Sequence, residues 1–74
     1  MYRVTRKQLI KQNGNVIEFE DSTEFDSYDA ADLLKLRLLS SEMSLGGLPY
    51  GPDKVIFESP TFYRSVQVTI EEIS

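Results

Sequence analysis

The dipeptide Asn13-Gly14 constrains the fold more than any other feature of this chain. It stands between two runs that are rich in β-forming residues, 2–11 and 16–19. A two-residue hairpin turn of type I′ needs positive φ at both central residues, and Asn followed by Gly tolerates this best. The sequence therefore predicts an antiparallel hairpin whose loop is these two residues.

The loop also predicts the pairing of side chains along the two strands. The expected partners are Gln12–Asn15, Ile10–Ile17, Leu9–Glu18, Gln8–Phe19 and Lys7–Glu20. In this register Ile10, Ile17 and Phe19 share one face with Val4, because successive side chains of a strand alternate between faces. Lys7 and Glu20 pair on the other face, where opposite charges contribute about 0.2–1 kcal/mol.

A helix is predicted to follow the hairpin. Asp26 or Ser27 caps its first turn by accepting a backbone hydrogen bond. The helix is expected to continue to about Met43, and Gly46-Gly47 ends it.

Two further strands complete the expected fold. One covers 54–58, Pro60 lies in the turn, and the other covers 62–70, where apolar and polar residues alternate. Residues 71–74 are expected to form a tail. Residues 1–74 are thus predicted to form a single α+β domain, a four-stranded antiparallel sheet with one helix packed on a face, in the order ββαββ.

The loop at 46–53 is long for a connection and carries two large apolar side chains, Leu48 and Tyr50. One interpretation is that both side chains fold back to close the core. The other is that they form a partner-binding surface, because exposed loops often carry function.

The predicted helix has more apolar surface than one small sheet covers. One stripe contains Ala30, Ala31, Leu34 and Leu38, and Leu33 extends it. A second stripe contains Leu36, Leu39 and Met43. A wide core stripe with one exposed Leu is the simpler explanation. The alternative is a homodimer that buries the second stripe, which suits a small domain with a limited core.

Enzymatic chemistry is not expected. The sequence contains no His and no Cys, so the commonest general base and the thiol nucleophile are both missing. The only glycine pair, Gly46-Gly47, follows a helix, whereas phosphate-binding glycines precede one. Asp26, Asp29 and Asp32 recur at a spacing that suits a hard cation, but acidic residues are also common at helix starts. We expect neither a metal nor a cofactor.

Charge is distributed unevenly along the chain, whose net charge is −4. Seven acidic residues and no Lys or Arg occupy 18–32; these residues are Glu18, Glu20, Asp21, Glu24, Asp26, Asp29 and Asp32. Such a ridge of carboxylates resembles the charge pattern of a nucleic-acid backbone and would attract a basic protein groove. The simpler explanation is a solubilising patch combined with the preference for acidic residues at helix starts.

Basic residues gather on the first strand, at Arg3, Arg6, Lys7 and Lys11. Direct nucleic-acid binding through them is one interpretation, but stacking aromatics are few and the net charge is negative. Neutralisation within the hairpin is more economical. No apolar run approaches the roughly 20 residues of a membrane span. We therefore expect a soluble intracellular protein without direct contact to nucleic acid or membrane.

In its size, acidic charge and ββαββ architecture, the chain resembles small phage-encoded host-takeover proteins of the DNA-mimic type. Several of these occupy the DNA-binding surface of a host protein, such as the HU nucleoid protein or the replication sliding clamp. The resemblance implies a homodimeric inhibitor in the host cytoplasm that presents its acidic face as a DNA substitute. The alternative is a general protein-interaction or assembly module that acts through strand edges, the Leu48–Tyr50 loop or the second helix stripe.

Overall fold

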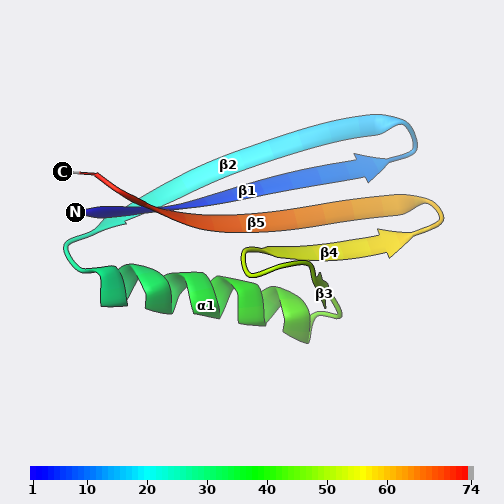
Figure 1. Ribbon diagram of the computed structural model, residues 1–74. Helices are drawn as coiled ribbons and strands as arrows, with labels where there is room; N and C mark the ends of the chain where they lie inside the picture. Colours follow the sequence, from blue (N-terminus) through cyan, green and yellow to red (C-terminus); the bar gives the residue numbers. More distant parts are fainter. Residues whose placement is uncertain (74) are drawn as a thin grey trace.

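The computed structural model describes residues 1–73 (Figure 1). The elements are β1 (Tyr2–Gln12), β2 (Asn15–Phe25), α1 (Tyr28–Ser44), β3 (Leu48–Pro49), β4 (Lys54–Ser59) and β5 (Phe62–Glu72). The predicted α+β class with one helix and an antiparallel sheet is confirmed.

The sheet has five strands in the order β2-β1-β5-β4-β3, so the expectation of four strands was wrong. The strand that was not predicted is β3, where Leu48 pairs with Ile56 and Pro49 with Val55. A two-residue strand has no alternating pattern of its own, and it forms because β4 offers it an edge. The described order of elements is therefore ββαβββ.

The predicted hairpin and its register are confirmed. Asn13 has a φ of 51° and Gly14 a φ of 81°, as a type I′ turn requires. Gln12 lies opposite Asn15, and the pairing continues to Tyr2 opposite Phe25. The turn thus aligns both strands over their full 11 residues.

Strand β5 is longer than expected and includes the predicted tail at Glu71 and Glu72. These residues pair with Arg3 and Tyr2 of β1, and the Ile73 amide donates to the Met1 carbonyl at 2.8 Å. The strand continues because the first strand supplies backbone partners along its whole length. The local sequence alone does not contain this information.

Ser27 is the N-cap of α1, and its hydroxyl accepts a hydrogen bond from the Ala30 amide at 3.2 Å. Of the two candidates, Asp26 therefore precedes the cap. The helix ends at Ser44, close to the expected end at Met43. Gly47 follows in a buried position against β4.

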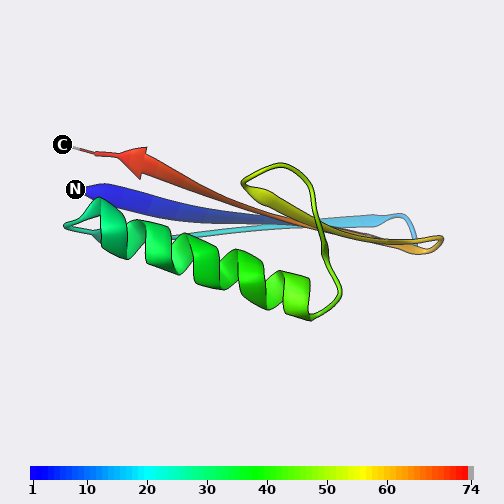
Figure 2. The ribbon, with the colours of Figure 1, turned by 60° about the horizontal axis from the view of Figure 1, so that its bottom comes forward.

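The helix covers one face of the sheet (Figure 2). Buried apolar side chains from both layers form the core: Val4, Ala31, Leu39, Val55, Val66 and Val68. Because Leu39 belongs to this core, it is not part of an exposed second stripe as the sequence suggested. The molecule measures 42 × 22 × 16 Å, and the tip of the β1–β2 hairpin extends past the end of the helix (Figures 1 and 2).

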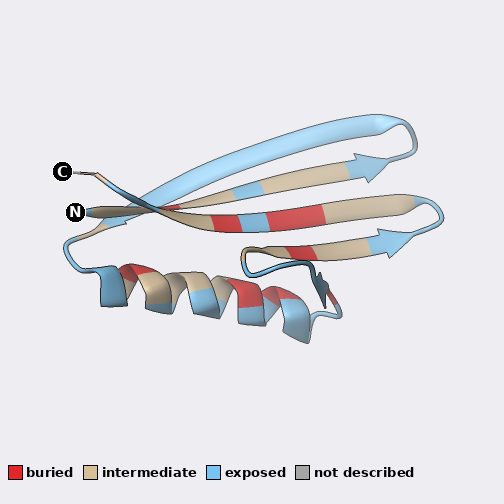
Figure 3. Ribbon diagram, viewed as in Figure 1, coloured by how far each residue is buried: buried red, intermediate tan, exposed pale blue. Residues whose placement is uncertain are grey.

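Burial is uneven across the sheet (Figure 3). The central β5 carries Val66 and Val68, which are fully buried, whereas β2 is exposed from Asn15 to Glu24. Over residues 1–73, no helix has the length and apolar character needed to cross a membrane.

Candidate protein-binding edge

Strand β2 is one edge of the sheet, and half of its backbone hydrogen-bonding groups point away from β1. The bond from Ile73 to Met1 shows that odd-numbered residues of β1 bond toward β5. Antiparallel ladders alternate, so even-numbered residues of β1 bond to the odd-numbered residues of β2. The outward-directed residues of β2 are therefore Val16, Glu18, Glu20, Ser22 and Glu24.

The two faces of β2 differ in chemistry. The outward-directed residues place their side chains on the face of the sheet that lacks the helix. Ile17 and Phe19 project from the helix-covered face, yet they are 49% and 54% exposed. They remain exposed because the helix packs mainly against β5 and β1 and contacts β2 less. The open face of β2 thus presents Glu18 and Glu20, whereas the helix-covered face presents Ile17 and Phe19 beside Asp21.

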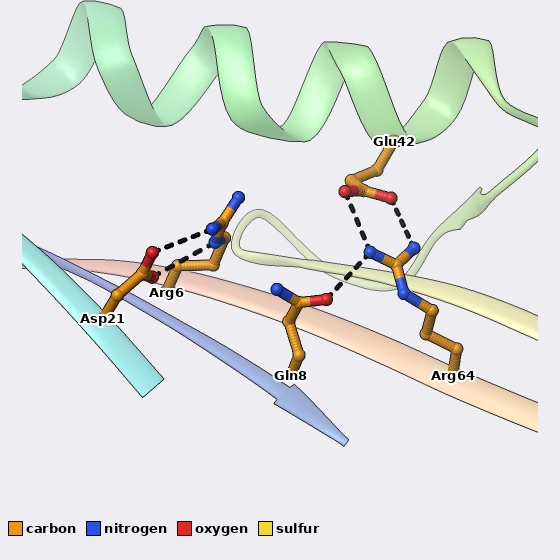
Figure 4. A network of polar contacts seen from close by, with 5 residues as sticks. All are labelled: Arg6, Gln8, Asp21, Glu42 and Arg64. Atoms are coloured by element: carbon orange, nitrogen blue, oxygen red, sulfur yellow. Dashed lines mark hydrogen bonds and ion pairs between the residues drawn. The ribbon is translucent and has the colours of Figure 1, made fainter. Parts of the chain in front are cut away.

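Two of the seven predicted acidic residues pair with arginines of β1. Asp21 accepts hydrogen bonds from Arg6, to Oδ2 at 2.8 Å and to Oδ1 at 3.2 Å (Figure 4). Glu24 lies 3.5 Å from Arg3. Both pairs join directly opposed residues, which confirms in part the expected neutralisation within the hairpin.

Glu18 and Glu20 have no ion-pair partner within 4.0 Å among the described residues. Glu18 stands opposite Leu9, so no cation faces it across the strand pair. Glu20 stands opposite Lys7 in the predicted register. These two exposed carboxylates are therefore the acidic groups of β2 that remain available to a partner.

The other predicted acidic residues belong to the start of the helix. Asp26 and Asp29 are exposed, and Asp32 is half-buried on α1. Asp21 points to the helix-covered face, whereas Glu18 and Glu20 lie on the opposite face. The acidic window is therefore divided between the open face of β2 and the region around the helix N-terminus.

The opposite edge of the sheet, β3, is short and has no backbone N–H directed outward. The Tyr50 amide bonds to the Lys54 carbonyl at 2.8 Å, so even-numbered residues of β4 bond toward β3. Pro49 consequently directs its backbone outward, and proline has no N–H. Leu48 and Tyr50 are 72% and 67% exposed, so they do not close the core.

The sequence analysis did not single out a polar network beneath the helix. Arg64 donates to Glu42 at 2.6 and 3.1 Å and to the side-chain oxygen of Gln8 at 2.9 Å (Figure 4). The guanidinium also lies over the ring of Phe57, 5.1 Å from its centroid. An arginine within an otherwise apolar alternation was the available signal. The network joins α1 to the sheet, and no buried side-chain nitrogen or oxygen atom among residues 1–73 lacks a hydrogen-bond partner.

Within the described part of the chain, no three His, Cys, Asp or Glu side chains gather where they could hold a metal ion. On the outer surface of α1, Leu36 and Met43 are 54% and 41% exposed.

Comparisons with protein-family models, curated proteins and solved structures gave no match. The candidate site is accordingly described from its own geometry.

Proposed function

We propose that this chain is a non-enzymatic binding module that engages a basic protein surface through β2. The supporting observation is the combination of an unpaired strand edge with two unpaired carboxylates, Glu18 and Glu20. Oppositely charged surfaces accelerate encounter and select partners, while mispaired like charges oppose binding. The arrangement favours recognition over covalent chemistry.

The narrower form of this proposal is a phage-encoded inhibitor that mimics DNA on a nucleoid protein or replication factor of its host. It is supported by four exposed carboxylates in two regions of the surface, Glu18 and Glu20 on the open face of β2 and Asp26 and Asp29 at the helix start. In this form, double-stranded DNA and the chain compete for one surface of the partner. In the broader form, the partner retains DNA while it is bound.

A pull-down from bacterial lysate at low and high salt tests the proposal. The wild-type chain is compared with the Glu18→Lys/Glu20→Lys variant and with the control Glu58→Lys/Glu72→Lys. The control changes net charge equally at two exposed sites outside the acidic window. We expect the first variant alone to lose the salt-sensitive partners. Equal capture by all three proteins would contradict the proposal.

A homodimer through the outer surface of α1 is a separate proposal. Leu33, Leu36 and Met43 are exposed there, and burying a large apolar side chain contributes about 1.5–3 kcal/mol before the costs of association. Leu36→Glu should reduce the sedimentation mass from two chains to one. An unchanged two-chain mass would remove the helix from the interface.

A further inference from the structure

We infer that β2 binds its partner by strand addition, and that the added segment is extended and alternates Lys or Arg with apolar residues. This inference rests on the proposed function and specifies how the basic partner is held. Strand addition to an open sheet edge derives affinity from main-chain hydrogen bonds and specificity from alternate side chains. Both contributions are present along β2.

The main-chain contribution comes from the outward-directed residues. Val16, Glu18, Glu20, Ser22 and Glu24 recur at every second position, each with an N–H and a C=O directed outward. None is a proline, and all five are exposed. An incoming strand can therefore continue the ladder over most of the length of β2.

The side-chain contribution defines the chemistry of the incoming strand. A strand added beside β2 places its own side chains on the same two faces. Those beside Glu18 and Glu20 meet carboxylates, so Lys or Arg suits these positions. Those beside Ile17 and Phe19 meet exposed apolar groups, so Val or Ile suits the positions between.

A second copy of the chain does not meet these requirements. In an antiparallel pair of two β2 strands related by a two-fold axis, residues opposite each other share a face. Every register centred on residues 18 to 22 then sets a glutamate of one copy (Glu18, Glu20 or Glu24) directly opposite a glutamate of the other copy. Like charges directly opposite each other are destabilising. Pairing of β2 with the β2 strand of a second copy is therefore disfavoured, and pairing with a basic strand is favoured.

A capped peptide in which Lys alternates with Val over the length of β2 is the probe. Two methylated forms have equal charge and equal numbers of methyl groups, one with N-methyl groups on Lys and the other on Val. Only one residue type directs its N–H groups toward β2, so strand addition predicts that one form loses at least about tenfold in affinity while the other binds. Equal affinity of the two forms would overturn strand addition.

The chain offers a matched pair of variants at Ser22. Ser22→Pro removes an outward N–H and leaves the bonds to β1, whereas Ser22→Ala retains that N–H. We expect about tenfold weaker peptide binding for the proline variant only, with circular dichroism confirming that both variants fold. If Glu18→Lys/Glu20→Lys abolishes binding but Ser22→Pro does not, strand addition is wrong and the proposed function stands. If the charge reversal has no effect on peptide binding or on the pull-down, the proposed function itself is wrong.

Discussion

The two edges of this sheet are built in opposite ways. Strand β2 has 11 residues, contains no proline and directs a regular row of N–H and C=O groups outward. Strand β3 has two residues, and its outward position is Pro49. Beyond β3, the remaining outward position of β4 is Glu58. One edge can therefore be extended by another strand, and the other cannot.

This difference indicates how the chain avoids indiscriminate edge pairing. Short strands, prolines and charges are three ways of blocking an edge. The β3 side uses the first two, which exclude every incoming strand. The β2 side uses charge alone, at Glu18 and Glu20, which excludes acidic strands and its own copy but admits a basic one. Charged side chains on an edge strand therefore select among incoming strands by their charge.

The largest expected effect concerns how β3 is held in place. A Cβ at Gly47 would overlap side chains of Val55 and Phe57, so Gly47→Ala should lower the free energy of unfolding by about 3 kcal/mol. Gly14→Ala has open space and a φ of +81°, so it should cost only about 1 kcal/mol, from backbone strain. Urea denaturation of both variants measures the difference. Equal losses would indicate that the β3 side is not tightly packed.

The next effect concerns the charge that protects β2. Glu18→Thr/Glu20→Thr removes the repulsion between copies and retains β-forming residues, so the average mass in sedimentation should rise to about double. Pro49→Thr restores one N–H on β3 and should leave the mass unchanged, because a two-residue strand offers too few bonds. Association of the Pro49→Thr variant instead would reverse the assignment of the two edges.

The smallest effect concerns the ion pair on the helix-covered face of β2. Arg6→Gln frees Asp21, whose side chain is largely exposed, so the loss of stability should stay below about 1 kcal/mol. The chain becomes more acidic beside Phe19, and association with the Lys/Val peptide should quicken at low salt. Stopped-flow mixing at two salt concentrations tests this. An association rate that is independent of the substitution and of salt would exclude electrostatic steering at β2.

Features fixed by neighbouring residues were predictable from the sequence. The type I′ turn at Asn13-Gly14 sets the hairpin register, and the alternation in β5 indicates its buried face. Ser27, the N-cap, was one of the two candidates that the sequence offered. Each of these features depends on contacts within a few residues or across a single turn.

Features that depend on distant partners were not predictable. Strand β3 exists because Ile56 offers it an edge, and Glu71 joins β5 because Arg3 lies beside it. The phase of the helix against the sheet buries Leu39 and exposes Leu36, although both lie in one apolar run. The acidic window was visible as a run of residues, but its division between faces required the strand order.

Amide hydrogen exchange along β2 tests the central claim most directly. In the free chain, the amides of Glu18, Glu20 and Ser22 should exchange fast, while those of Ile17 and Phe19 exchange slowly. With the Lys/Val peptide at saturation, protection should rise at the even-numbered residues alone. Uniform exchange along β2 in the free chain, or a bound state without protection that alternates along the strand, would contradict an open edge that binds by strand addition.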